Sequence, residues 1–175
     1  LAGTISTKID NYETLIMNDL KEREEHSLVI DDLSSKLKKI ASDIHISDTY
    51  CFDFGPIAHI KTDLSFTAHS QTSAQDLVKL LSPSAALGGF PSNKVAKHLR
   101  KLKYYQFDKD LREFGGVFGF TYKDEAFALV AIRNLYWNQK QACIHSGSGI
   151  VKDSDPIRER SEIKNKRASI LNLFS

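Results

Sequence analysis

The stretch VFGFTYKDEAFALVAIRNLYW, residues 117–137, decides the class of fold that this chain of 175 residues adopts. Between Val117 and Tyr136, two arms rich in aromatic and β-branched residues flank the polar turn Lys123-Asp124-Glu125. Arms of this composition are typical of paired strands, so the stretch predicts an antiparallel hairpin.

Long helical patterns lie on both sides of this hairpin. Leu33, Leu37 and Ile40 recur at helical spacing without an intervening Gly or Pro, and they predict one helix from about Tyr12 to Ile44. A final helix is expected from about Pro156 to Phe174. Long helices combined with antiparallel hairpins indicate the α+β class.

Shorter elements are predicted between these segments. Gly55-Pro56 separates two strand-like runs, and Gly88-Gly89-Phe90-Pro91 forms a turn. The remaining predictions are strands from about Thr49 to Phe66, a helix over Asp76–Leu81, a Ser92-capped helix to about Lys103, and a strand over Ala142–His145.

The composition indicates one soluble globular domain and argues against a nucleic-acid partner. Hydrophobic residues make up 41% of the chain, charged residues 26%, and the net charge is +2 with both signs interspersed. A local basic cluster is better explained as the solvated face of a helix. It comprises Lys94, Lys97, Arg100, Lys101 and Lys103.

Cysteine usage and hydropathy point to the cytoplasm. Cys51 and Cys143 lie far apart and match neither a zinc pattern nor a dense disulfide framework, as expected in a reducing compartment. Apolar runs stay well short of membrane-spanning length, so no membrane partner is predicted. The oligomeric state is left open.

Two pairs of glutamates, each spaced three residues apart, form a candidate metal site. Glu22 and Glu25 share one helix face, as do Glu159 and Glu162, and two such faces turned together would bind a hard cation such as Mg²⁺. The alternative is an ordinary exposed helix, in which Glu162 and Lys166 form an i,i+4 pair that adds about 0.2–0.5 kcal/mol. Taken alone, the pattern favours that alternative.

The loop before the last helix is suited to an anion. Gly147-Ser148-Gly149 lets backbone N–H groups approach a bound anion, and Lys166 adds a cation on the helix face that carries Glu162. Ser154-Asp155-Pro156 then begins the helix with a capping residue and a first-turn proline. Metal and organic acid could therefore meet here.

Several segments, taken in order along nearly the whole chain, resemble those of the chorismate-utilising enzymes, and most closely the isochorismate synthases. They are LAGT (1–4), KEREEHSLVID (21–31), HIKT (59–62), PSAALGGFP (83–91), FGGVFG (114–119), Arg133, and SGSGIVKDSDPIRERSEIKNK (146–166). The resemblance implies part of a large sandwich of two facing, mainly antiparallel sheets with helices outside. In that family LAGT lies well inside the domain, so residues 1–175 are expected to be the C-terminal portion of one chorismate-binding domain whose N-terminal portion is absent from this chain.

The resemblance also assigns the acidic residues to a Mg²⁺ ion. Glu25 and Glu162 would be direct ligands, with Glu22 and Glu159 acting directly or through metal-bound water. The metal would bind the ring carboxylate of chorismate.

The second carboxylate of chorismate would be held by Arg133 and the loop Gly147, Ser148, Gly149, with Lys166 supplying further positive charge. The resemblance places Gly3, Thr4 and Phe114 in the substrate-binding set as well. His59 would be catalytic, facing the ring hydroxyl. The alternatives are an edge-strand charge paired with a surface acid for Arg133 and a hydrogen-bonded core residue for His59.

The implied reaction adds water to one ring carbon and removes the hydroxyl at another, for menaquinone or siderophore biosynthesis. Ala2 stands where some aminodeoxychorismate-forming relatives carry a lysine nucleophile, which favours a free nucleophile such as water. The family's lysine base and glutamate acid lie upstream of LAGT, so this chain alone is expected to be inactive.

Three positions depart from the family pattern: Phe114 replaces a usual tyrosine, Ser82 a common histidine, and Ser148 an alanine. The alternatives to isochorismate synthase are a salicylate or anthranilate synthase, which share these residues, and a catalytically silent domain of the same fold.

Overall fold

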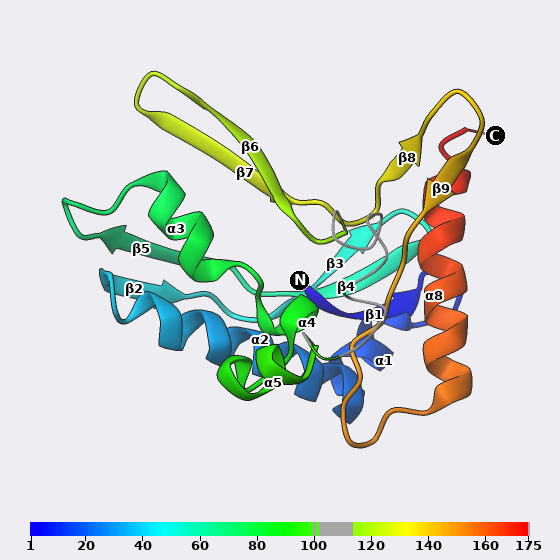
Figure 1. Ribbon diagram of the computed structural model, residues 1–175. Coiled ribbons are helices and arrows are strands. Elements are labelled where there is room, and N and C mark those ends of the chain that lie inside the picture. Colours follow the sequence, from blue (N-terminus) through cyan, green and yellow to red (C-terminus); the bar gives the residue numbers. More distant parts are fainter. Residues whose placement is uncertain (100, 102–113, 175) are drawn as a thin grey trace. The chain divides into compact units, whose positions relative to one another are not determined.

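The computed structural model describes residues 1–99, 101 and 114–174 (Figure 1). The chain divides into two compact units. The first comprises residues 1–28, 47–63 and 133–175, and the second comprises residues 29–46 and 64–132. The mixed helices and antiparallel strands confirm the predicted α+β class.

A three-stranded antiparallel sheet lies at the centre of the first unit. Strand β4 (Ile57–Lys61) pairs with β1 (Ala2–Ser6) on one side and with β3 (Tyr50–Phe54) on the other. The β3–β4 connection confirms the strand-like runs predicted around Gly55-Pro56. The β1–β4 register shifts between Ala2 and Thr4, at Gly3.

Gly3 makes this shift possible through its backbone conformation. Its φ is +81°, a left-handed value that favours glycine. A Cβ added there would lie 3.2 Å from both Cβ and the carbonyl oxygen of Glu22 and 3.2 Å from Cδ1 of Ile60. The bulge therefore brings the backbone of β1 close to the helix that carries Glu22.

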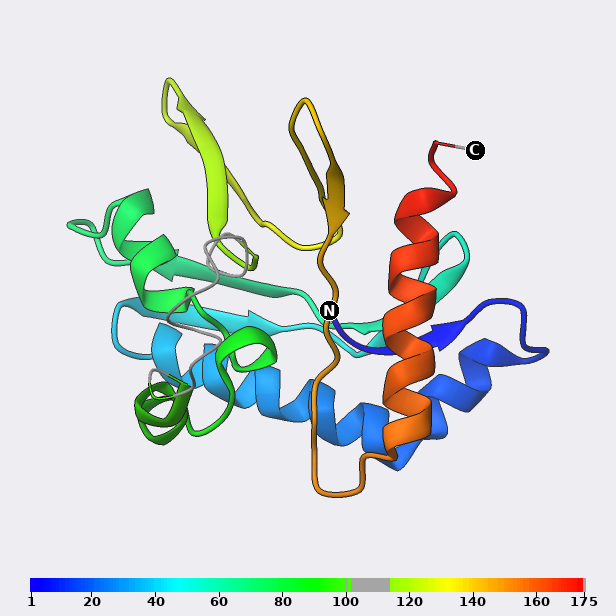
Figure 2. The same ribbon diagram turned by 45° about the vertical axis from the view of Figure 1, so that its right-hand side comes forward.

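Helices pack on this sheet and bury its central strand. Ala58 and Ile60 are fully buried, as is Ile16 of helix α1 (Tyr12–Asn18), which contacts β1, β3 and β4. Helix α8 (Pro156–Leu171) also contacts β1 and β4, and Figures 1 and 2 both show it beside β1. Because side chains alternate along a strand, His59 points to the face opposite that of Ala58 and Ile60.

The single helix predicted from Tyr12 to Ile44 is wrong at two points. It is interrupted at Asp19, whose backbone is extended and whose Oδ1 accepts hydrogen bonds from the amides of Lys21 (3.0 Å) and Glu22 (3.2 Å). Asp19 thereby separates α1 from helix α2 (Leu20–Leu37).

The second error concerns residues 41–44. They belong to strand β2 (Ala41–Ile46), which pairs in antiparallel fashion with β5 (Leu64–Ala68) in the second unit. The helical spacing that includes Ile40 extends past Leu37, but pairing with β5 determines the structure of the following residues.

The second unit also contains α3 (Ala74–Leu81), which confirms the helix predicted at Asp76–Leu81. Ser73 and Asp76 form a capping box at its start. Helix α4 (Ala85–Gly88) is short, and Asp32 of α2 accepts a hydrogen bond from the amide of its first residue over 3.0 Å.

The predicted basic helix is α5 (Ser92–Leu99), which starts at Ser92 as expected. Lys94, Lys97 and Lys101 are exposed, in agreement with a solvated face, whereas Arg100 and Lys103 lie outside the described residues. None of the helices within the described residues is long and apolar enough to cross a membrane.

The hairpin that decided the fold class is present but shorter than predicted. Strands β6 (Val117–Tyr122) and β7 (Glu125–Val130) pair across the polar turn (Figure 1). Beyond β7, the last three residues of the stretch form a separate strand of the first unit, β8 (Leu135–Trp137), which pairs with β9 (Ala142–Ile144). Arg133 lies in the connection between β7 and β8 and has a left-handed φ of 57°.

Candidate active site

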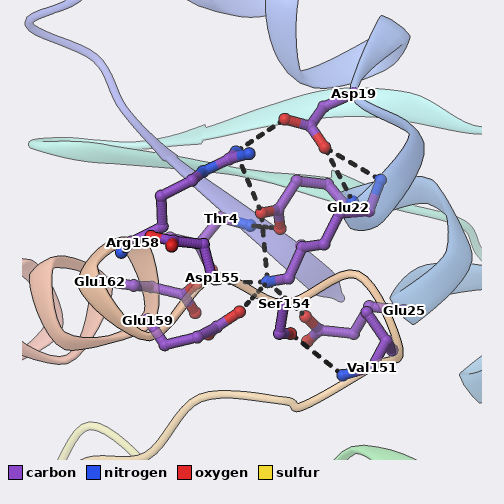
Figure 3. A network of polar contacts seen from close by, with 12 residues as sticks. Thr4, Asp19, Glu22, Glu25, Val151, Ser154, Asp155, Arg158, Glu159 and Glu162 are labelled. Carbon is purple, nitrogen blue, oxygen red and sulfur yellow. Dashed lines mark hydrogen bonds and ion pairs between the residues drawn. The ribbon is translucent and has the colours of Figure 1, made fainter.

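Helix α8 begins as its sequence predicts. The carboxylate of Asp155 accepts hydrogen bonds from the amides of Ile157 (3.1 Å) and Arg158 (2.8 Å), and Pro156 occupies the first turn. Arg158 in turn donates to Oδ2 of Asp19 over 2.7 Å, which ties the first turn of α8 to the start of α2 (Figure 3).

This link brings the two glutamate pairs face to face. Figure 3 shows the side chains of the pair on α2 and the pair on α8 turned toward one another. Between them lies the Nζ atom of Lys21, whose side chain is 8% exposed. Its distances to the carboxylate oxygens are 3.0 Å to Glu159, 3.2 Å to Glu22, 3.3 Å to Glu25 and 3.7 Å to Glu162.

Burial and mutual repulsion govern the ionisation of these groups. Burial raises the pKa of Glu25, and the neighbouring carboxylates of Glu162 and Glu22 raise it further, against the attraction of Lys21. Burial likewise raises the pKa of Glu22. Burial alone would lower the pKa of Lys21, but the surrounding glutamates outweigh burial and raise it. Lys21 therefore stays charged.

Glu159 differs from the α2 pair in the balance of these effects. Burial would raise its pKa, but Lys21 and the hydroxyls of Ser154 and Ser148 together outweigh burial and leave the pKa below the usual value. Glu159 is also the carboxylate nearest to the ammonium, at 3.0 Å.

Glu22 and Glu25 have different neighbours besides Lys21. Oε2 of Glu22 accepts a hydrogen bond from the backbone amide of Thr4 over 2.8 Å, which fastens the helix to β1. Glu25 lies against Gly149, where an added Cβ would come within 2.6 Å of the carboxylate. Because residue 149 is a glycine, the backbone of the loop can lie close to the carboxylate of Glu25.

Glu162 is paired with Lys166, one turn further along α8. Their side chains are 9% and 14% exposed, so the alternative of a pair on an exposed helix surface is wrong. Lys166 also donates a hydrogen bond to the carbonyl oxygen of Gly147 over 3.1 Å, which holds the glycine loop beside α8.

His59 and Arg133 form a second polar group in the same unit. The guanidinium of Arg133 reaches Nε2 of His59 over 3.0 Å and Oγ of Ser169 on α8 over 3.3 Å. Nδ1 of His59 lies 2.9 Å from the carbonyl oxygen of Gly3 and 3.2 Å from Oγ1 of Thr4.

These partners fix the protonation state of His59. A carbonyl oxygen only accepts, so Nδ1 carries the proton and donates to Gly3, and Nε2 accepts from the guanidinium, which only donates. Burial lowers the pKa of His59 to about 4, and the nearby charge of Arg133 acts in the same direction. His59 is therefore neutral near pH 7.

All but one of the residues predicted for the site lie in the first unit. The predicted metal-binding glutamates cluster around Lys21, and Gly3, Thr4, His59 and Arg133 contact one another in the second polar group. Phe114 belongs to the second unit, where it is half-buried.

Sequence reasoning missed Lys21, Asp19 and Arg158. A signal for Lys21 was available, because it precedes Glu25 by four residues and so shares its helix face. The contact between Asp19 and Arg158 joins positions 139 residues apart, and the sequence pattern holds no sign of it.

The donor set fits a hard divalent cation. Among the described residues, no group of three or more His, Cys, Asp or Glu side chains is arranged to hold a metal ion, and an ammonium lies between the carboxylates. Carboxylate oxygens are nevertheless the ligands that Mg²⁺ prefers. Burial and, to a smaller extent, the neighbouring carboxylates raise the pKa values of Glu22 and Glu25, and a bound cation would offset both effects.

Known proteins resemble this chain along its whole length. The profile of a family described as chorismate binding enzyme matches residues 1–175. Isochorismate synthase EntC of Escherichia coli K12 is 31% identical over 156 residues, which is 88% of this chain and 39% of EntC. Anthranilate synthase component 1 of Thermococcus kodakarensis is 25% identical over 163 residues, 91% of this chain and 37% of that protein.

The fold is also that of a solved isochorismate synthase. MenF, the menaquinone-specific isochorismate synthase from Escherichia coli, superposes with a TM-score of 0.82 at 23% identity, covering 99% of this chain and 41% of MenF. The chain thus spans about two fifths of the length of the proteins it matches. The profile match over all 175 residues, together with the similarity to EntC, shows that this chain belongs to the family of chorismate-binding enzymes.

Proposed function

We propose that this chain is the C-terminal portion of the chorismate-binding domain of an isochorismate synthase, which converts chorismate to isochorismate in the cytoplasm with the help of Mg²⁺. The observation that carries the proposal is the buried cluster of glutamates from α2 and α8, in the same unit as the pair His59 and Arg133. The similarity to EntC supports the choice of reaction.

The metal would be held by Glu25 and Glu162, with Glu22 and Glu159 in support. Glu22 is already committed to the amide of Thr4, and Glu159 is the carboxylate nearest to Lys21, which makes both less available as direct ligands. Mg²⁺ takes few carboxylates and keeps several waters, so two direct ligands suffice. When bound, the metal would neutralise and orient the ring carboxylate of chorismate.

Arg133 would bind the second carboxylate of the substrate. Its guanidinium carries five N–H donors, and the contacts with His59 and Ser169 engage one nitrogen each. A planar guanidinium held in this way is suited to a carboxylate. The loop Gly147 to Gly149 and Lys166 would add positive potential beside it.

The nucleophile would be water. Position 2 is a buried alanine, so β1 offers no lysine amine there to attack the ring. Water then adds at one ring carbon while hydroxide leaves from another, with one proton accepted from the water and one given to the leaving hydroxyl. The base and the acid would come from the part of the domain that precedes LAGT.

The test is the product formed by the protein purified at its full encoded length. It is incubated with chorismate and Mg²⁺, without an amine donor, and the product is identified by chromatography and mass. Isochorismate supports the proposal. Salicylate would assign the protein to the lyase branch, anthranilate formed only after ammonia is added would assign it to the amine-dependent branch, and unchanged chorismate under both conditions would indicate a silent domain.

A further inference from the structure

Lys21 lies at the centre of the glutamate cluster, but the proposed function gives it no role. It lies in the first turn of α2, and its Nζ approaches one carboxylate oxygen of each of four glutamates, Glu22, Glu25, Glu159 and Glu162. The side chain is 8% exposed, which is unusual for a lysine unless its charge is paired.

The ammonium of Lys21 reduces the repulsion among the carboxylates, as a bound metal ion would. Carboxylates gathered in a buried site repel one another, and each positive charge among them lowers that repulsion. Lys166 pairs with Glu162, and the guanidinium of Arg158 is 3.9 Å from Glu22. Among the described residues, Lys21 is the cation that forms ion pairs with all four glutamates.

The four distances span only 3.0–3.7 Å, and Nζ donates hydrogen bonds to Glu22 and Glu25. Nζ lies closer to Glu159 (3.0 Å) and Glu22 (3.2 Å) than to Glu25 (3.3 Å) and Glu162 (3.7 Å). The nearer two are the glutamates assigned above to support, and the farther two are the proposed direct ligands. An ammonium that releases the farther pair would keep its two shorter contacts.

We propose that Lys21 is a resident counter-ion that competes with the divalent cation, holding the four glutamates together in the metal-free protein and withdrawing from Glu25 and Glu162 when the metal enters. This inference rests on the proposed function, because it takes the cluster to be a Mg²⁺ site. It makes Lys21 the residue that limits metal affinity, since a metal and an ammonium cannot share the same two carboxylates without mutual repulsion.

The test measures the binding of Mg²⁺ alone by titration calorimetry, with the protein at its full encoded length. Lys21→Met keeps most of the aliphatic stem and removes the competing charge, so Mg²⁺ affinity should rise by about tenfold or more. Lys21→Arg keeps a charge that cannot be lost and that grips two carboxylates, so Mg²⁺ affinity should fall below that of the wild type. The melting temperature of Lys21→Met without divalent cations should drop, and Mg²⁺ should restore it.

Lys36→Met is the matched control. Lys36 lies on the same helix and pairs with Asp32 over 2.8 Å, with a side chain that is 14% exposed. Its removal should leave Mg²⁺ affinity at the wild-type value. An equal rise in Lys36→Met and Lys21→Met would overturn the inference, because general loss of positive charge would then explain both.

The outcomes separate this inference from the proposed function. If the wild type binds Mg²⁺ and Lys21→Met binds it equally or more weakly, Lys21 is no competitor and the metal site stands. If neither protein binds Mg²⁺, the metal site and the competition both fall. If Lys21→Met does not fold, Lys21→Arg decides the question, since unchanged or tighter binding in that variant overturns the competition.

Discussion

Arg133 donates a hydrogen bond to Nε2 of His59 over 3.0 Å, so the proposed carboxylate-binding arginine is supported by a histidine that must remain neutral. The proton of His59 is on Nδ1, which donates to the carbonyl of Gly3 at the bulge of β1. Protonation of Nε2 would remove the acceptor and place a second cation against the guanidinium. The geometry therefore assigns His59 a supporting role toward Arg133, and a role as proton donor from Nε2 would require that contact to break.

Replacing His59 with glutamine should reduce the loss of stability on acidification. The pKa of His59 is about 4 in the folded protein and about 6.5 when unfolded, so the unfolded state binds more protons between those values. The contribution of His59 is therefore fully present above about pH 6.5 and is lost as pH falls through about 4. Urea unfolding of both proteins between those pH values should show a wild-type advantage that shrinks by roughly 2 kcal/mol.

His69→Gln is the control for this measurement, because His69 is exposed. Its unfolding free energy should follow that of the wild type at every pH. Parallel curves for the wild type and His59→Gln would contradict the neutral state assigned to His59.

Replacing Arg133 with methionine should weaken substrate binding in the proposed isochorismate synthase reaction. Hydrogen bonds to a charged group contribute about 1.5–3 kcal/mol, so kcat/KM for chorismate should fall by roughly 10–100-fold. Arg160→Met is the control, because Arg160 lies exposed on α8. Steady-state kinetics with both variants tests the role, and equal kcat/KM values would remove Arg133 from the substrate site.

Local sequence signals predicted much of this fold. The capping residue Asp155, the turn at Gly55-Pro56 and the polar turn between β6 and β7 each act within a few residues, and each is confirmed. The errors occur where pairing with a segment distant in sequence determines the local structure. Residues 41–44 are a strand because they pair with β5, and the second hairpin arm ends at Val130, where its partner strand begins at Val117.

The sequence likewise predicted only part of the geometry of the candidate site. Glutamates three residues apart predict a shared helix face, and the family resemblance indicated that the two faces meet. Neither signal predicts that Lys21 lies between the two helix faces. Its position depends on how α8 packs against α2 through Arg158 and Asp19. The pairing of His59 with Arg133 across 74 residues was equally outside the reach of local patterns.

Replacing Glu25 with glutamine should stabilise the metal-free protein and remove its response to Mg²⁺. The pKa of Glu25 is raised by burial and by the carboxylates of Glu162 and Glu22, so its charge opposes folding at pH values above the unfolded pKa. In thermal melts at pH 7 without Mg²⁺, Glu25→Gln should have a higher melting temperature than the wild type, by about 2–4 °C for each kcal/mol of unfolding free energy gained. Added Mg²⁺ should not raise the melting temperature of Glu25→Gln further.

Glu24→Gln serves as the control for Glu25→Gln, because Glu24 is exposed one residue away. Its stability should stay within about 0.5 kcal/mol of wild type, and its response to Mg²⁺ should be unchanged. A Mg²⁺ response that survives in Glu25→Gln would exclude Glu25 as a direct ligand.

Two glycines of one loop offer a sharper test of the same site. A Cβ at Gly149 would lie 2.6 Å from the carboxylate of Glu25, whereas a Cβ at Gly147 would meet nothing within 4 Å. The obstructed group is the end of a flexible side chain, so Gly149→Ala should fold while displacing the Glu25 carboxylate. Calorimetry should therefore show weaker Mg²⁺ binding in Gly149→Ala and wild-type binding in Gly147→Ala. Equal Mg²⁺ affinity in the two variants would mean that the position of Glu25 does not control the metal site.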